Sequence, residues 1–431
     1  MKIIEGFDKA LKLLDRRAPK DLEYKQEAAV RQIINDVRQR GDKALFELTE
    51  KFDGAKLTAL EVKSAQIKAA YEKVDGKLVD ALKLAAQRIG DFHRMQQERS
   101  LSTFTHDKTG WMVRPLERVG AYTPGGTASY PSSLLMTAIP GKVAGVKEMI
   151  LATPPGKDGN VVPMTLVAAD IAGINRIFSI GGAQAIAAMA FGTDSVPRVD
   201  KIFGPGNIYI FLAKKLLYGV VGIDGLWGPS EIVVIADETA DPDYCASDLL
   251  AQSEHGGVSQ QSPAIFITPS RELAEKVIKS LEKQMKTLSR KAIVGQALEE
   301  SGMVVVVKNI EEAIKLTNIY GPEHVLLVTR PDMAYEEQIT NAGCIIYGPK
   351  GTVPMSDYVS GPSHVLPTGG TARFFSPLNV TEFVKIINLS HVDDALLSVS
   401  GEAAITIARA EGLDAHAQAI ELRMKKMRKK R

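Results

Sequence analysis

The chain has 431 residues, enough for roughly two or three domains with sizeable hydrophobic cores. Its net charge of +2 gives no reason to expect nucleic acid as a partner, and no apolar run is long enough to span a membrane. Cys245 and Cys344 are the only cysteines and lie far apart, so a disulfide framework is not expected and a reducing, cytoplasmic compartment fits.

The first part of the chain is predicted to be helical. Residues 21–52 and 62–99 carry apolar residues at helical spacing. Short extended pieces follow around 111–115, and then a turn at Gly120–Thr127 combines Pro with paired glycines. Such a turn lets the backbone approach a ligand closely, although a plain surface loop is the commoner outcome. Tyr122, beside the turn, could stack on a planar ring.

From Glu148 the pattern changes to alternating strands and helices, which predicts βαβ units and a parallel sheet. Two strand-to-helix turns, Gly181–Gln184 and Gly204–Asn207, are rich in glycine and would suit a phosphate at a helix N-terminus. Neither turn is a complete dinucleotide fingerprint, and no acidic residue stands at the usual distance to bind a ribose. The expected strands are 149–152, 177–180 and 201–203, and the expected helices are 165–172, 183–191 and 207–218.

A second unit of the same kind and similar size follows, which suggests a duplication, although no clean sequence repeat supports it. Its first strand is entered through Gly228–Glu231. The expected strands are 232–235, 264–267, 303–307, 325–328 and 344–347, and the expected helices are 244–253, 271–285 and 310–320.

Polar residues with catalytic or metal-binding chemistry cluster in this second unit. Gln252 and His255 end a helix and are three residues apart, so they share a helical face and could hold a divalent metal. Glu323 and His324 are adjacent on a turn and form a candidate acid/base pair. An irregular stretch, 348–371, carries Asp357 and His364. For each of these residues alone, an ordinary structural role remains the commoner outcome.

From Val380 the chain is expected to be helical again, with helices at 393–410 and 414–426 joined by Glu411–His416. The basic end, Lys425–Arg431, is expected to complement the dipole of the last helix. The fold predicted from these patterns is α/β: two parallel-sheet, incomplete Rossmann-like units, with N-terminal helices and a helical C-terminal tail.

Eight short motifs, in this order and over essentially the whole chain, resemble the histidinol dehydrogenase family. Each motif alone is weak, but the ordered set is specific. They are Tyr122–Gly126, Gly181–Ala185, Gly204–Asn207, Gly228–Glu231, Ala251–Gly256, Gly321–His324, Ser360–Thr368 and Glu411–His416.

The resemblance implies NAD-dependent oxidation of L-histidinol to L-histidine through L-histidinal, by a homodimer with one Zn²⁺ per subunit. It makes His324 the base of the hydride steps and Glu323 the residue that activates water. Zinc would be bound by Gln252, His255, Asp357 and, from the partner chain, His416. The substrate would meet Ser230, Gln252, His255, His324, Asp357, His364, Glu411 and His416, and NAD would meet Tyr122, Gln184 and Asn207.

The resemblance also assigns roles along the chain. Residues 1–110 would be a helical segment packed with the second α/β unit, and 111–235 would be the NAD-binding domain. Residues 236–375 would hold the zinc and the acid/base pair, and 376–431 would be a tail that reaches the partner subunit.

Three other functions stay open at the level of sequence. A relative with the same NAD and zinc apparatus could oxidise another small alcohol, such as a sulfonated diol. A zinc-dependent hydrolase would need no nucleotide. A non-catalytic metal- or nucleotide-binding protein is also conceivable, although the intact pair of Glu323 and His324 argues against it.

Overall fold

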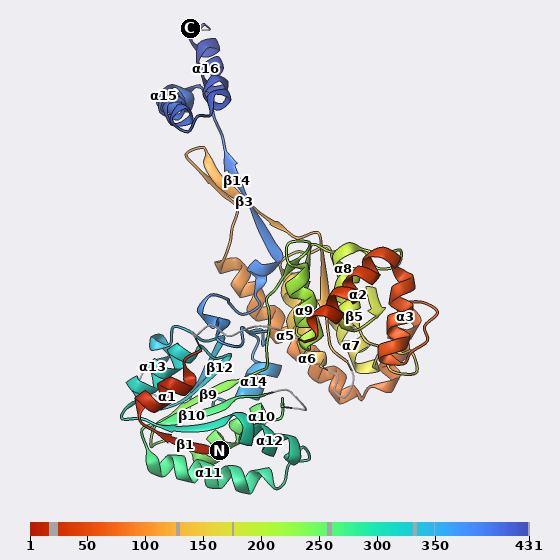
Figure 1. Ribbon diagram of the computed structural model, residues 1–431, viewed down its shortest axis with the longest axis vertical. Helices are drawn as coiled ribbons and strands as arrows, with labels where there is room; N and C mark the ends of the chain where they lie inside the picture. Colours follow the sequence, from red (N-terminus) through yellow and green to blue (C-terminus); the bar gives the residue numbers. More distant parts are fainter. Residues whose placement is uncertain are drawn as a thin grey trace. The chain divides into compact units, whose positions relative to one another are not determined.

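The computed structural model describes residues 1–16, 25–125, 130–174, 176–256, 261–330, 334–348 and 350–429. Residues 21–24 of the first expected helix, Gly126 and Thr127 of the Gly-rich turn, and Lys430 and Arg431 lie outside these ranges. The chain divides into two compact units: Met1–Arg99 with Pro115–Phe383, and Ser100–Arg114 with Val384–Arg431. The first unit contains two parallel sheets (Figure 1).

The first of these sheets has six strands in the order β1-β11-β10-β9-β12-β13, and every adjacent pair is parallel. The strands are β1 (Lys2–Glu5), β9 (Ile232–Ala236), β10 (Ala264–Thr268), β11 (Gly302–Val306), β12 (His324–Val328) and β13 (Cys344–Tyr347). Helices α10 (Pro242–Ser253), α11 (Arg271–Met285) and α12 (Lys291–Ser301) cover one face, and α1 (Phe7–Leu14) and α13 (Ile310–Tyr320) cover the other.

Strand β9 shows why this sheet is buried on both faces. Ile232 and Val234 pack into the cluster under α10, whereas Val233 and Ile235 pack into the cluster under α13. All four side chains are fully buried. The continuous apolar run is typical of a parallel strand between two helical layers, because the side chains alternate between faces and both faces are covered.

The second sheet has five parallel strands in the order β6-β5-β4-β7-β8. These are β4 (Arg118–Tyr122), β5 (Glu148–Thr153), β6 (Arg176–Ser179), β7 (Lys201–Phe203) and β8 (Gly222–Ile223). In both sheets the consecutive βα units run in the order 3-2-1-4-5, with β1 added at the edge of the larger sheet, and this shared order agrees with the suggested duplication. In the smaller sheet the order reverses between β4 and β7, and ligands of such sheets bind at that switch point.

Six helices pack around this smaller sheet or on one another beside it. They are α2 (Glu27–Arg40), α3 (Asp42–Asp53), α6 (Pro131–Val143), α7 (Pro163–Ala172), α8 (Gly182–Phe191) and α9 (Ile208–Leu217), and α4 (Ser64–Ala70) and α5 (Gly76–Arg99) lie against α7 and α6. The N-terminal segment is therefore divided between the sheets. Among the described elements of residues 1–110, β1 and α1 join the second α/β unit, whereas α2 to α5 pack beside the smaller sheet. The expectation that all of residues 1–110 pack with the second unit was therefore wrong.

Three other predictions from the sequence, one domain bound and two assignments of secondary structure, also need correction. The bound at residue 235 falls inside β9, which pairs with β10 and β12 in the six-stranded sheet. The stretch expected to be irregular, 348–371, contains a short helix, α14 (Val353–Tyr358). The chain after Val380 is not helical throughout, because a strand, β14 (Val384–Ser390), separates a short 3-10 helix at Val380–Phe383 from α15.

The second compact unit consists of a small sheet and a helical hairpin. The sheet has the order β14-β3-β2, with β2 at Phe104–His106 and β3 at Thr109–Pro115. Helices α15 (Asp394–Ala410) and α16 (Asp414–Arg428) pack on each other around Ile405, Ala408, Ala417 and Met424. Four short 3-10 helices complete the described elements, at Tyr71–Lys73, Tyr335–Gln338, Thr371–Arg373 and Val380–Phe383. None of the described helices combines the length and the apolar character needed to cross a membrane.

Candidate active site

The acid/base pair lies at the amino-terminal edge of the six-stranded sheet. Glu323 ends the turn before β12 and His324 is the first residue of that strand, and both side chains are buried. His324 Nδ1 lies 3.5 Å from Glu323 Oε2, and His324 Nε2 lies 3.3 Å from Asp357 Oδ1. The structure thus places the imidazole between two carboxylates, one from its neighbour in sequence and one from α14.

The charges around His324 act on its protonation. Burial by itself would lower the pKa of His324, but the carboxylates of Glu323 and Asp357 outweigh burial and raise the pKa well above its ordinary value. For Asp357, burial acts to raise the pKa, but His324, His364 and His255 outweigh it and leave the pKa lowered. Asp357 therefore stays ionised, and the imidazole of His324 binds its proton firmly in this arrangement.

Ser230 and Gln252 extend the same cluster. The Ser230 hydroxyl donates to Glu323 Oε2 at 2.5 Å, and Gln252 Nε2 donates to the Ser230 hydroxyl at 2.9 Å. Ser230 comes just before β9, and Gln252 belongs to the last turn of α10, whose chain direction returns it to the amino-terminal edge of the sheet. Parallel topology thus gathers residues about ninety apart in sequence at one edge.

His364 also belongs to this region, but both of its ring nitrogens are occupied. Nδ1 donates to the carbonyl of Asp357 at 2.7 Å, so Nε2 accepts from the Ser133 hydroxyl at 3.0 Å. Burial lowers the pKa of His364, which favours the neutral ring with this tautomer. A substrate that contacts His364 would have to replace Ser133 as its partner.

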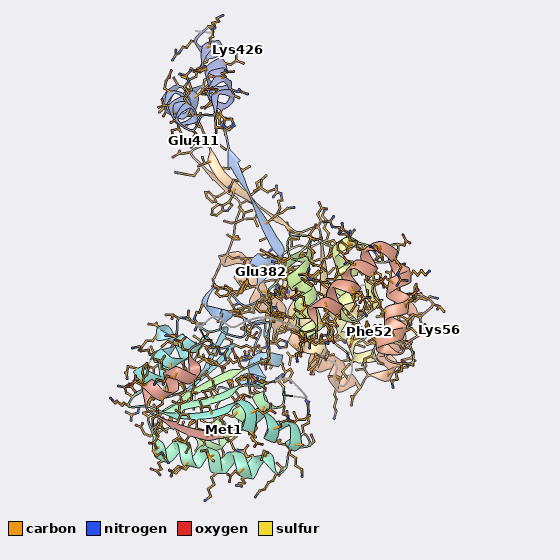
Figure 2. All side chains as sticks on the ribbon, viewed as in Figure 1. Met1, Phe52, Lys56, Glu382, Glu411 and Lys426 are labelled. Carbon is orange, nitrogen blue, oxygen red and sulfur yellow. The ribbon has the colours of Figure 1, made fainter. Side chains whose placement is uncertain are left out.

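His255 follows α10 directly and is exposed, and its charge acts on Asp357. Glu411 and His416 belong to the second compact unit. Glu411 caps the C-terminus of α15 (Figure 2), His416 lies in the first turn of α16, and both are exposed. Of the four expected metal ligands, the first unit therefore brings Gln252, His255 and Asp357 to the same region.

The expected cofactor residues lie at the carboxyl ends of the strands of the five-stranded sheet. Tyr122 ends β4, Gln184 is in the first turn of α8, and Asn207 caps α9 with its Oδ1 accepting from the backbone of Tyr209 and Ile210. Tyr122 Oη accepts from the Gly182 N–H at 3.2 Å. Because the Tyr122 ring is only 3% exposed and lies in the apolar core, the expected stacking on a planar ring is not supported; its hydroxyl anchors the turn instead.

The turns between these residues leave little room for side chains. Gly182 has φ +63°, and a Cβ there would lie 2.6 Å from Gln184 Oε1. Gly204 has φ +112°, and a Cβ there would meet the Tyr122 carbonyl oxygen at 2.1 Å. At Gly204 a side chain would collide with the backbone of Tyr122, so glycine is required there, whereas at Gly182 the positive φ favours glycine and the Gln184 side chain could move aside.

Comparison with known proteins decides the family. The profile described as histidinol dehydrogenase matches residues 15–424. Histidinol dehydrogenase of Dehalococcoides mccartyi strain CBDB1 is 50% identical over 98% of this chain and 100% of the relative, and that of Clostridium acetobutylicum is 47% identical over 92% of both. The chain belongs to the histidinol dehydrogenase family. The crystal structure of the enzyme from Elizabethkingia anophelis matches with a TM-score of 0.92 and 37% identity, over 99% of both chains.

Membership of the family confirms the resemblance drawn from the eight motifs and the α/β fold predicted with it. Sequence reasoning did not identify three further residues that contact the cluster: Ser133 on His364, Ser262 on Gln252, and Glu231 on Glu323. Serine and glutamate residues carry no local signal of such contacts, because the contacts join positions up to 231 residues apart.

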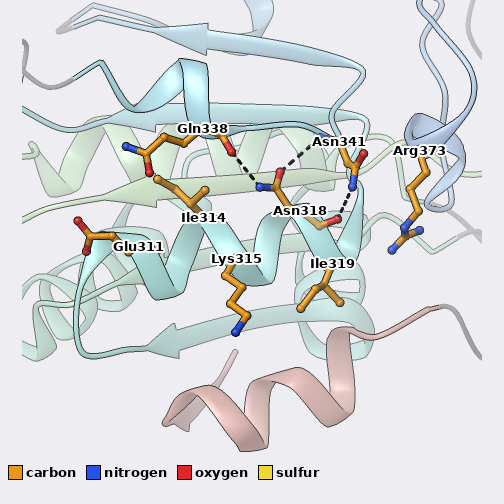
Figure 3. A pocket seen from close by; sticks show the side chains of 8 residues that line it. All are labelled: Glu311, Ile314, Lys315, Asn318, Ile319, Gln338, Asn341 and Arg373. Carbon is orange, nitrogen blue, oxygen red and sulfur yellow. Dashed lines mark hydrogen bonds between the residues drawn. The ribbon is translucent and has the colours of Figure 1, made fainter.

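A separate cavity of about 630 Å³ lies along α13 and does not include the acid/base pair. Asn318 holds its rim together: its amide donates to the Gln338 carbonyl and its backbone carbonyl accepts from Asn341 (Figure 3). Arg373 lines the same cavity. The hydrogen bonds of Asn318 fix the chain that leads into β13, which is a structural role.

Proposed function

We propose that the chain is a cytoplasmic, homodimeric enzyme that oxidises L-histidinol to L-histidine through L-histidinal with two NAD⁺, in the last steps of histidine biosynthesis. The named relatives support the substrate and the reaction. The observation that carries the proposal is the buried pair of Glu323 and His324 with the Ser230 hydroxyl bonded to it, because two successive oxidations require two different kinds of proton handling at one place.

In this proposal His324 removes the hydroxyl proton in each hydride step, and NAD⁺, when bound, accepts the hydride. Glu323 removes a proton from the water that adds to the aldehyde. Ser230 donates to Glu323 Oε2, which leaves Glu323 Oε1 as the oxygen that faces the water. Asp357 holds the imidazole from the side opposite Glu323. A cation bound to Asp357 would weaken the stabilisation that this carboxylate gives to protonated His324. The pKa of His324 would then fall toward the range of a useful base.

The donor set fits a zinc ion that is completed from outside the first unit. Asp357 Oδ1 is buried, and its one polar contact given above is the 3.3 Å ion pair with His324 Nε2, which does not have the geometry of a hydrogen bond. Within the described ranges no three His, Cys, Asp or Glu side chains gather to hold a metal, so Gln252, His255 and Asp357 would need a further ligand, and we propose His416 of a partner subunit. Zn²⁺, when bound, supplies a template that holds the substrate through its imidazole and amino nitrogens.

Two features at the switch point of the five-stranded sheet support NAD binding there. Gln184 Oε1 is buried without a partner among the described residues, so it is available to accept a hydrogen bond from a ligand. The N-terminus of α8 begins at Gly182 in the same place and suits a pyrophosphate. We therefore propose Tyr122, Gln184 and Asn207 as the residues that bind or shape this site, with the Tyr122 hydroxyl fixing the turn at Gly182.

The second compact unit supports the dimer. Its helical hairpin buries few residues of its own, and apolar side chains remain exposed, including Val399 at 85% and Ile407 at 59%. Several large apolar side chains exposed on one small unit are typical of a surface that another chain covers. We propose that this unit packs on a second copy and brings Glu411 and His416 to the partner's site.

The test separates the two oxidations. Wild-type protein, His324→Ala and Glu323→Ala would be compared with histidinol and with histidinal supplied separately, following NADH. His324→Ala should lose both reactions, whereas Glu323→Ala should lose histidinal oxidation by about 100-fold or more and spare histidinol oxidation. His106→Ala, an exposed histidine, is the control.

Equal damage to both reactions in both variants would contradict these roles. If the wild-type protein reduced NAD⁺ with other small alcohols but not with histidinol, the substrate assignment would be wrong.

A further inference from the structure

The residue behind the catalytic pair is Glu231, which the reaction itself does not use. Its side chain is 3% exposed and is held from three directions. Arg16 donates to both of its oxygens, at 2.9 Å and 2.5 Å, the Tyr320 hydroxyl donates to Oε2 at 3.1 Å, and the Gly369 N–H donates to Oε1 at 3.1 Å. These partners come from the segment after α1, the end of α13 and the loop after His364.

The backbone of Glu231 contacts both catalytic residues. Its N–H donates to Glu323 Oε2 at 2.9 Å, and its carbonyl accepts from the His324 N–H at 3.2 Å. The Glu323 carboxylate therefore has two donors, the Ser230 hydroxyl and the Glu231 N–H, on consecutive residues. Any shift of this short segment moves the carboxylate of Glu323 directly, but it reaches His324 only through the backbone.

The ion pair is well suited to fix this segment. The Arg16 guanidinium forms a two-pronged pair with the carboxylate, the arrangement with the strictest geometry, and it also lies over the Tyr320 ring at 3.3 Å from the centroid. Burial raises the pKa of Glu231 to about 7, and Arg16 opposes that rise. Without Arg16, Glu231 would be a buried acid beside a second buried acid, Glu323, and the two would repel each other.

We propose that the pair of Arg16 and Glu231 is a positioning device for Glu323, and that it sets the rate of the second oxidation more than that of the first. The inference rests on the proposed function, because it assigns water activation to Glu323. A displacement of about 1 Å at a catalytic group can cost on the order of 100-fold in rate. The water-activating step depends on the Glu323 carboxylate and therefore takes most of this loss.

The experiment measures kcat and KM for histidinol and for histidinal in Arg16→Lys, Arg16→Met and Glu231→Gln. Arg16→Lys keeps the charge without the two-pronged geometry and is the variant most certain to fold. In each variant we expect the kcat for histidinal to fall about 10- to 100-fold, the kcat for histidinol to fall several-fold less, and KM to stay within about 3-fold. Arg16→Lys should lose less than Arg16→Met.

The matched control is Arg31→Met, which breaks an exposed pair with Glu27 and should leave both rates unchanged. Circular dichroism confirms that each variant keeps its helix signal. Equal losses in both oxidations, or wild-type rates in Arg16→Lys and Arg16→Met, would overturn the inference. If the wild-type protein itself shows no histidinol oxidation, the proposed function fails, which is a different result from wild-type activity that these variants leave untouched.

Discussion

The buried ion pair of Lys214 and Asp224 offers the clearest quantitative prediction, and the change is Lys214→Met. Lys214 Nζ donates to Asp224 Oδ1 at 2.5 Å and to the Gly204 carbonyl at 2.7 Å. Asp224 Oδ2 accepts from the Gly204 N–H at 2.7 Å and from the Trp227 indole at 3.0 Å. Both charged side chains are at most 3% exposed. The pair thus closes the Gly204 turn, beside the proposed nucleotide site, onto the chain that leads to Ser230.

The magnitude follows from what the methionine leaves behind. Two hydrogen bonds to a charged group are lost, each worth about 1.5–3 kcal/mol. The apolar stem keeps its packing, and Asp224 retains its two other donors, so part of the loss is offset. Breaking a buried pair by removing one partner costs about 3–5 kcal/mol, and we expect a loss of stability in this range. The Gly204 turn should loosen with it and weaken NAD binding.

The assay is urea unfolding followed by tryptophan fluorescence. The chain has two tryptophans, and a Trp111→Phe background makes Trp227, which lies in the network itself, the sole reporter. Lys215→Met is the matched control. This change removes the charge of the next residue in the same helix, where Lys215 Nζ lies 3.8 Å from Glu27 Oε2 in a partly exposed ion pair. It should lower the free energy of unfolding by less than about 1 kcal/mol. Equal costs for Lys214→Met and Lys215→Met would refute the reasoning.

Three further predictions concern charge, metal and assembly. Burial raises the pKa of Asp53 to about 6, above its unfolded value of about 3.9. Protonation of Asp53 therefore stabilises the folded protein relative to the unfolded chain. This contribution is complete below the unfolded pKa and is lost as the pH rises through about 6. Asp53→Asn should therefore gain melting temperature relative to wild type between pH 4 and pH 7.5, and a constant difference would contradict this. Chelation of metal should abolish activity while the circular dichroism of helices remains, because both faces of the six-stranded sheet have apolar cores of their own; joint loss of both signals would mean a structural metal. Co-expressed His255→Ala and His416→Ala chains should recover activity in mixed dimers if sites are shared, whereas a mixture that stays inactive would show that each chain builds its own site.

The sequence could predict the βα units because their signals are local. Continuous apolar runs between turns predict buried strands, and the helix at Ile310–Tyr320 and the strand at Cys344–Tyr347 were predicted with the bounds that the structure shows. The edge strand β1 and strand β14 were not predicted, because short strands with exposed faces have no distinct pattern. The ordered motifs gave the family, which the comparisons confirm.

Within the candidate site, the sequence by itself determined which side chains carry acid/base and metal-binding chemistry, since those properties belong to the residue types of Glu323, His324 and Asp357. Only the tertiary structure decided that they meet at the amino-terminal edge of one sheet, while the glycine turns meet at the carboxyl edge of the other. It also decided that Arg16 lies against Glu231, 215 residues away. Contacts of that kind depend on strand order and helix packing, which the cooperative burial of the whole apolar core selects and which no local stretch encodes.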